Sequence, residues 1–209
     1  DWSSDVCSSD LEELEEGFQA GVRHIDHFWC AMSSITSIRT RLGWPQRASM
    51  VEFVLAEKKM STELIADGQH LAPCLLRFAY QVIGPERLLL VTDSNRAVDM
   101  PAGKYRFGPN TTGTWFHSNG QMGFEDDGGP ASTVRGMDFM VKHMHEAAGV
   151  PLHEVVNMAS LNPAKRLGVD KKLGSLQPGR RADVVILSKD LDVKRVFIAQ
   201  QEFTQAPPF

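Results

Sequence analysis

Hydrophobic positions in the first half of the chain alternate between helical spacing and strand-like runs. The apolar residues of the first predicted helix recur among acids at Leu11, Leu14 and Phe18, and Gly21 ends this run. The other elements predicted in this half are a strand over 22–28, a helix over 50–55 and a strand over 63–66. Helices and strands that alternate in this way are typical of an α/β fold with a parallel sheet.

A wholly apolar run at residues 88–91 is typical of a strand buried on both faces of a parallel sheet. Pro73 begins the helix before this strand, and Gly84 ends it. The segment 105–124 is rich in Gly, Asn, Thr and aromatic residues and predicts a hairpin or a long loop. Ser132 is predicted to cap a long helix. The core residues expected on that helix are Met137, Met140 and Met144. The last predicted elements are helices over 152–159 and 162–167 and strands over 182–187 and 193–199.

Polar residues with chemical capability follow three successive predicted strands. His27 closes the first strand, His70 follows the second, and Asp93 follows the third. Functional groups at the carboxyl ends of successive strands are the layout of a (β/α)8 barrel active site. A whole barrel needs roughly 250 residues, and only three or four strand–helix units can be identified in this sequence. The pattern therefore predicts part of a barrel.

Each of these residues also has a structural interpretation. His27 could be a hydrogen-bonded structural histidine with Asp26 as its partner, and His70 could bond within its own loop. Asp93 could cap a turn, as an Asp before Ser-Asn often does. Cys30 is interpreted as a packed thiol, because no Cys–His arrangement is evident. Taken together and in strand order, the three strand-end residues favour a site.

Composition and charge exclude some classes of binding partner for this chain. Lys and Arg number 22 against 26 Asp and Glu, a net charge of -4, so no basic field exists to hold nucleic acid. The longest apolar runs are too short to span a membrane. The three cysteines lie far apart with no Cys-x-x-Cys, which fits a reducing cytoplasm and no disulfide framework.

The chain divides into three predicted regions. Residues 1–11 form a Ser- and Asp-rich tract without helical or strand period, and we expect it to be non-native. Residues 12–168 are expected to form the partial barrel. Residues 169–209 are expected to supply the C-terminal strands of a small β-sandwich domain.

Four segments of the chain carry a family resemblance. Residues 21–32, Gly-Val-Arg-His-Ile-Asp-His-Phe-Trp-Cys-Ala-Met, resemble Gly-Val-Thr-His-x-Thr-His-Leu-Phe-Asn-Ala-Met of N-acetylglucosamine-6-phosphate deacetylases, in the amidohydrolase superfamily. The likeness continues over 64–70, 84–93 and 158–164. A further segment, 173–185, is similar to one widespread in the superfamily. The resemblance covers about residues 12–199.

The resemblance implies a fold and an activity. The fold would be the C-terminal half of a (β/α)8 amidohydrolase barrel with the terminal strands of a β-sandwich. The activity would be metal-dependent hydrolysis that releases acetate from an N-acetylated amino-sugar phosphate. By position in the motifs, His27 would bind a divalent metal, zinc or iron, and Asp93 would move the proton of the catalytic water. His70, the pair Cys30–Ala31 and Arg39 would contact the substrate. We expect a homodimer for the full-length protein.

Departures from the family pattern leave alternatives open. Cys30 stands where the family has an asparagine, and Arg39 and Arg41 lie near its phosphate-binding arginine without the surrounding pattern. The family's metal glutamate and second metal histidine lie upstream of this chain, so we expect the chain alone to be inactive. The alternatives are an amidohydrolase that acts on a cyclic amide or an amine, and a non-catalytic sugar-phosphate-binding remnant.

Overall fold

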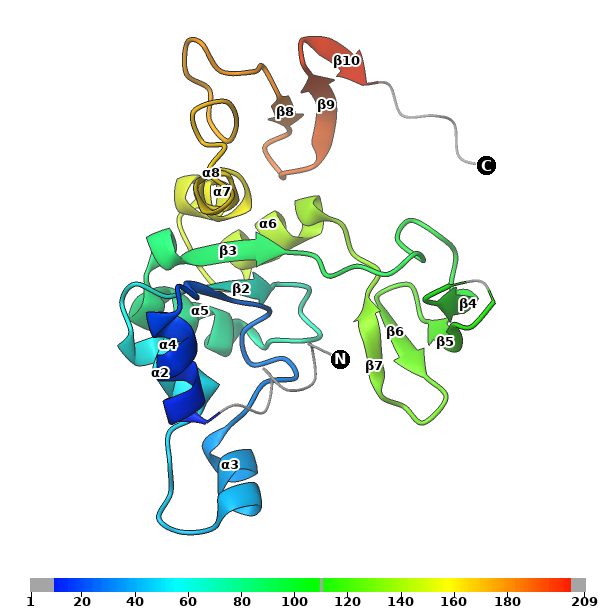
Figure 1. Ribbon diagram of the computed structural model, residues 1–209. Coiled ribbons are helices and arrows are strands. Elements are labelled where there is room, and N and C mark those ends of the chain that lie inside the picture. The colour runs from blue at the N-terminus through cyan, green and yellow to red at the C-terminus, as the bar shows by residue number, and fades with distance from the viewer. Residues whose placement is uncertain (1–9, 110, 204–209) are drawn as a thin grey trace.

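The computed structural model describes residues 10–109 and 111–203, whose strands form three sheets (Figure 1). The first sheet is parallel, in the order β1-β2-β3. Its strands are β1 (His24–Ile25), β2 (Ser61–Ile65) and β3 (Leu88–Val91). Ile25 pairs with Thr62 and Ile65 pairs with Val91. The carboxyl ends of the three strands therefore lie at one edge of the sheet, and the chain is mixed α/β as predicted.

Helices pack around the parallel sheet and bury its apolar residues. They are α2 (Leu11–Gln19), α4 (Met50–Ala56), α5 (Pro73–Ile83), α6 (Met137–Glu146), α7 (Leu152–Ala159) and α8 (Leu161–Arg166), with a 3-10 turn η1 (Pro85–Arg87); α3 (Ile35–Leu42) projects away from the sheet. The fully buried core side chains include Phe28, Leu64, Leu88, Met140 and Met144. Burying each one is worth about 2 kcal/mol, so this cluster is the main source of stability. The methionines of α6 lie in the core as predicted.

The first helix begins inside the tract predicted to be non-native. Residues 1–9 of that tract lie outside the described residues. Asp10 caps α2, because its carboxylate accepts hydrogen bonds from the backbone N–H groups of Glu12 at 3.1 Å and Glu13 at 3.2 Å. The Glu13 carboxylate in turn accepts the N–H of Asp10 at 3.0 Å, which completes a capping box. Asp10 and Leu11 therefore belong to the folded chain.

The first strand is shorter than predicted, and one helix was not foreseen in the sequence. Only His24 and Ile25 of the predicted strand 22–28 are paired, because the chain after Ile25 turns out of the ladder. Helix α3 follows this turn. Its cap, Ser34, accepts the N–H of Ser37 at 3.2 Å. Ile38 is the buried residue of α3, so its apolar pattern is too weak to predict a helix.

Between β3 and α6 the chain forms a four-stranded antiparallel sheet, which extends the predicted hairpin. Its strands are β4 (Gly103–Phe107), β5 (Thr114–Ser118), β6 (Met122–Glu125) and β7 (Pro130–Thr133). The prediction that Ser132 caps the long helix is wrong. Ser132 lies in β7 with a φ of 62°, because Thr133 pairs with Met122 of β6. Helix α6 begins only at Met137, after Gly136.

The chain's last strands form a separate antiparallel sheet in the order β10-β9-β8. They are β8 (Val184–Leu187), β9 (Val193–Ile198) and β10 (Gln201–Phe203). The first two confirm predicted strands. Apolar side chains of this sheet stay exposed, with Val185 at 55% and Phe203 at 62%. A second sheet packed against them would bury them, as in a β-sandwich. No helix among the described residues is long and apolar enough to cross a membrane.

A buried asparagine joins α8 to the start of β3. The side-chain amide of Asn162 donates hydrogen bonds to the carbonyl oxygens of Pro85 at 2.7 Å and Leu88 at 2.8 Å. Asn162 is only 7% exposed, so water does not readily replace these bonds. The amide therefore fixes where β3 enters the sheet.

We predict that Asn162→Ala destabilises the fold by roughly 1–3 kcal/mol, because it leaves two carbonyl groups without their donor. Urea unfolding followed by circular dichroism measures the change. Asn157→Ala, at an exposed position of α7, is the control and should stay within about 0.5 kcal/mol of the wild type. Equal stability of the two variants would contradict the role of Asn162.

Candidate functional site

Three loops leave the carboxyl edge of the parallel sheet, and each carries a polar residue at the same offset. His27, Asp67 and Asp93 each come two residues after the last residue of β1, β2 and β3. In Figure 1 the arrowheads of β2 and β3 point toward the side where β4–β7 lies. The parallel register brings the loops to one edge, as the sequence predicts. Sequence reasoning placed His70 at the second strand end, and Asp67 lies closer to it.

The first loop fixes the orientation of His27. Its Nδ1 atom lies 2.8 Å from the carbonyl oxygen of Cys30. A carbonyl only accepts, so in the neutral ring Nδ1 carries the proton and Nε2 keeps its lone pair. Metal-binding histidines are commonly held by such a bond from the other ring nitrogen. His27 therefore fits a metal ligand through Nε2, and Asp26 is not its hydrogen-bond partner.

The second loop joins Asp67 and His70 in a close pair. One carboxylate oxygen of Asp67 accepts the backbone N–H groups of Gln69 at 2.9 Å and His70 at 2.8 Å. The other lies 2.8 Å from Nδ1 of His70. Burial alone would raise the pKa of Asp67, but these hydrogen bonds and the charge of His70 together lower the pKa to about 2. The ionised Asp67 thus holds His70 with Nε2 directed away from the carboxylate.

Helix α6 supports this second loop from the side. Gly68 has a φ of 74°, and a Cβ atom there would lie 3.0 Å from Cε1 of His143. The His143 ring stacks on Phe139, with centroids 5.7 Å apart. The Nε2 atom of His143 is buried and has no hydrogen-bond partner among the described residues. The His143 ring therefore limits the space beside Gly68 in the second loop.

The third loop presents Asp93 to solvent. Asp93 is exposed and has a left-handed φ of 48°. Within residues 10–109 and 111–203 its carboxylate accepts no hydrogen bond. The turn after β3 is instead closed by Asn95, whose side-chain oxygen accepts the N–H of Ala97 at 2.9 Å. This geometry gives no support to the turn-capping interpretation of Asp93 and leaves its carboxylate available.

Cys30 belongs to the first loop. Burial, and with it the negative charges of Asp67 and Asp93, raises the pKa of its thiol to about 11. The thiol is protonated at neutral pH and is a poor nucleophile. The interpretation as a packed thiol agrees with this environment.

A second polar cluster lies on β1 and β2, and sequence reasoning did not identify it. His24, Asp26 and Glu63 each offer one possible metal-binding atom, all within 4.8 Å of one another. The two ring nitrogens of His24 already contact the Ser61 hydroxyl at 2.8 Å and Glu63 Oε1 at 3.1 Å. Burial alone would raise the pKa of Glu63. Hydrogen bonds from His24 and the His27 backbone, with the charges of both rings, outweigh burial and lower this pKa.

Ser61 and Glu63 are two residues apart on β2, so their side chains lie on the same face of the strand, and Ser61 pairs with His24 in the register. This spacing is the feature of the sequence that could have revealed the cluster.

Two further predicted residues lie around the first loop. Ala31 is part of that loop and has a φ of 53°. Arg39 lies on α3, which projects away from the sheet in Figure 1, and its guanidinium faces Trp44 at 5.5 Å. The structure therefore does not bring Arg39 to the strand ends.

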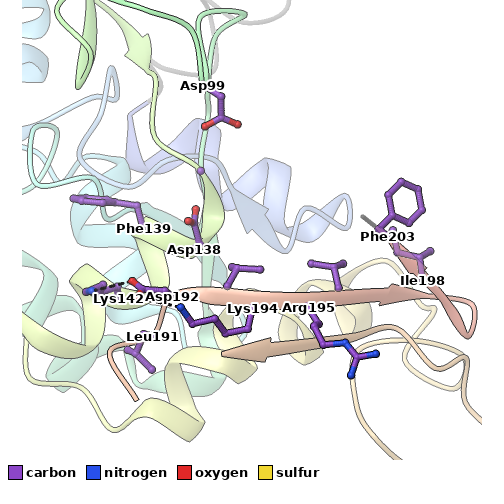
Figure 2. Close-up of a pocket in the computed structure, with 13 residues that line it drawn as sticks. Asp99, Asp138, Phe139, Lys142, Leu191, Asp192, Lys194, Arg195, Ile198 and Phe203 are labelled. Carbon is purple, nitrogen blue, oxygen red and sulfur yellow. Dashed lines mark ion pairs between the residues drawn. The ribbon is translucent and has the colours of Figure 1, made fainter. Parts of the chain in front are cut away.

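A groove of about 800 Å³ lies elsewhere, between α6 and β9 (Figure 2). Lys142 and Lys194 line it and pair with Asp192 at 3.6 and 3.9 Å. None of the strand-end residues lines this groove. The candidate site is therefore the carboxyl edge of the parallel sheet, where the strand-end residues lie.

The low pKa of Asp67 predicts a pH-dependent stability. The carboxylate stabilises the fold above its unfolded pKa near 4, and this contribution is lost as the pH falls through about 2. The shift corresponds to roughly 2 kcal/mol. In Asp67→Asn, the free energy of unfolding should lose that part of its dependence between pH 4 and pH 2 in urea titrations. The exposed Asp126→Asn is the control. An unchanged pH profile in Asp67→Asn would contradict the assigned pair.

Comparison with known proteins identifies the family. The model of the Amidohydrolase family matches residues 9–202. N-acetylgalactosamine-6-phosphate deacetylase of Escherichia coli O157:H7 is 34% identical over 190 residues, which are 91% of this chain and 47% of that protein. N-acetylglucosamine-6-phosphate deacetylase of Bacillus subtilis is 31% identical over 185 residues, 88% of this chain and 44% of that protein. The chain thus spans about half the length of these two relatives.

Solved structures agree with the sequence comparison. The N-acetyl-D-glucosamine-6-phosphate deacetylase of Mycobacterium smegmatis superposes with a TM-score of 0.81 at 27% identity, over 93% of this chain and 49% of that one. The corresponding enzyme of Pasteurella multocida gives a TM-score of 0.84 at 23% identity, over 95% and 49%. These matches confirm the resemblance found in the sequence segments. The chain belongs to the Amidohydrolase family.

Proposed function

We propose that this chain is the C-terminal half of a (β/α)8 amidohydrolase barrel, with residues 12–168 in the barrel and 169–209 in a small β-sandwich. The full-length protein would remove the acetyl group from an N-acetylated amino-sugar phosphate, as a cytoplasmic homodimer. One observation carries this proposal. Three successive parallel strands deliver His27, Asp67 with His70, and Asp93 to the same edge. That is the position of the active site in a barrel of this kind.

His27 is the residue of this chain that we assign to a divalent metal. Its Nδ1–H is bound to the Cys30 carbonyl, so Nε2 is oriented and available. A catalytic zinc or iron typically takes about three protein ligands, and the resemblance to the family places a glutamate and a second histidine upstream of this segment. The metal would supply Lewis acidity toward water and the amide carbonyl.

We assign the proton transfers to Asp93. Its carboxylate accepts no hydrogen bond within the described residues, and Asp93 follows β3 at the same sheet edge as His27 and Asp67. A carboxylate placed there can accept a proton from the attacking water and then donate it to the leaving amine. Acetate and the amino-sugar phosphate with a free amine would be the products.

Substrate contacts fall to the first and second loops. His70, held by Asp67, presents Nε2 as a polar group for the sugar or the acetyl oxygen. Cys30 and Ala31 line the first loop, and Arg39 is the proposed phosphate contact on the projecting α3. The names of the relatives cover both the glucosamine and the galactosamine derivatives, so both 6-phosphates are the substrates to test.

We predict that Asp93→Asn lowers kcat of the full-length protein roughly 10²–10⁴-fold, since the amide cannot take the proton. The melting temperature should stay nearly unchanged, because the carboxylate makes no hydrogen bond to any residue that the structure describes. Amine release from both 6-phosphates measures the rate. The matched control is Asp99→Asn, also exposed and with a positive φ of 60°, which should keep wild-type kcat. A near-normal kcat in Asp93→Asn would refute the assignment.

We also predict that Cys30→Asn raises kcat/KM for N-acetylglucosamine 6-phosphate. The change replaces a weak thiol donor by an amide with a donor and an acceptor. The gain should be on the order of 1 kcal/mol, the usual net worth of one hydrogen bond. Cys74→Asn, at an exposed cysteine of α5, is the control. No change, or a loss with this substrate, would favour a different natural ligand.

A further inference from the structure

We propose that Glu63 is a positioning residue for His27. In this proposal, Glu63 clamps the turn after β1 so that Nε2 of His27 points in one fixed direction. The inference rests on the proposed role of His27 as a metal ligand, and it names the residue of β2 that holds this ligand in place.

Glu63 contacts the first loop through both its side chain and its backbone. Its Oε2 atom accepts the backbone N–H of His27 at 3.4 Å, and its backbone carbonyl accepts the N–H of Phe28 at 2.8 Å. Two successive N–H groups of the turn are therefore bound by one residue of the neighbouring strand. Together with the His27–Cys30 bonds, these contacts determine the path of the backbone at the proposed ligand.

The turn needs such a clamp because the regular ladder ends early. Strand β1 has only two paired residues, and His27 lies beyond them. After His27 the backbone takes left-handed conformations at Trp29 and Ala31, with φ of 66° and 53°. Non-glycine residues adopt this region at a cost, so surrounding contacts must hold them there. On the sheet side, the contacts with Glu63 do so.

His24 in turn fixes the Glu63 carboxylate. Its Nε2 atom lies 3.1 Å from Oε1 of Glu63, and its Nδ1 atom lies 2.8 Å from the hydroxyl of Ser61. The carboxylate therefore uses one oxygen for His24 and the other for the His27 backbone. The side chains of His24 and Glu63 are only 16% and 21% exposed, which limits competition from water. The His24–Glu63 pair thus links β1 to β2 next to the turn that Glu63 clamps.

His24 and Glu63 could instead bind a cation together with Asp26, and the two roles make different demands. The clamp needs a hydrogen-bond acceptor at position 63 and does not need Asp26, whose side chain is exposed. A cation site needs the charges of both Glu63 and Asp26. Glutamine keeps an acceptor for His27 and an amide that can bond to His24, but removes the charge.

The test compares variants of the full-length protein that contains this chain, by zinc titration calorimetry and by hydrogen exchange of the peptide spanning His27. Glu63→Ala should weaken zinc binding about 10- to 100-fold, as expected when the support of a metal ligand is lost. It should also speed exchange at the His27 amide. Glu63→Gln should restore most of both properties. Asp26→Asn should change neither by more than about twofold.

Glu86→Ala is the matched control, since it removes an exposed acid next to β3 without touching the loop. If Glu63→Ala behaves like Glu86→Ala in both measurements, the proposal is overturned. It is also overturned if Glu63→Gln and Asp26→Asn lose zinc as severely as Glu63→Ala, because the cluster is then a cation site. If His27→Gln leaves zinc binding unchanged, the proposed function fails at His27. Faster exchange in Glu63→Ala then still supports the clamp, and unchanged exchange rejects it.

Discussion

The parallel pairing of β2 with both of its neighbours is the constraint on which the site depends. Parallel strands run in one direction, so the loops that follow them leave from one edge. A register shift by one residue between β2 and β3 would exchange the two faces of the strand and bury Glu63 among the helices. The apolar face formed by residues such as Leu64 and Leu88 prevents that shift, because it must meet the core. The hydrophobic pattern thereby also fixes where the polar groups stand.

Charge is concentrated at this edge and is balanced by hydrogen bonds. Asp67 is buried and ionised because three donors surround its carboxylate. Cys30 stays neutral because burial and the charges of Asp67 and Asp93 raise the pKa of its thiol, while Asp93 reaches solvent. Two aspartates at equivalent strand ends therefore differ in character: Asp67 orients a neighbour, and Asp93 has a carboxylate that remains available.

The sequence predicted the elements whose apolar pattern is strong. The strand at 88–91 and the helix at 152–159 have the predicted bounds, and the strand-end order anticipated one common edge. Local rules failed where pairing across the chain decides the structure. Serine is a residue type that often caps helices, yet strand pairing places Ser132 in β7. The cluster around Glu63 escaped notice because its members are far apart in sequence and meet only through the strand register.

The bonds of Asn162 also have a consequence for the order of folding. Its contacts with Leu88 and Pro85 span 74 and 77 residues along the chain. Closing loops of this length carries an entropic cost before any contact repays it. During synthesis, at roughly 5–20 residues per second, β3 is complete several seconds before Asn162 leaves the ribosome. The strand that precedes Asp93 is therefore fixed only after a helix far along the chain has been made. We expect the site to assemble late in folding.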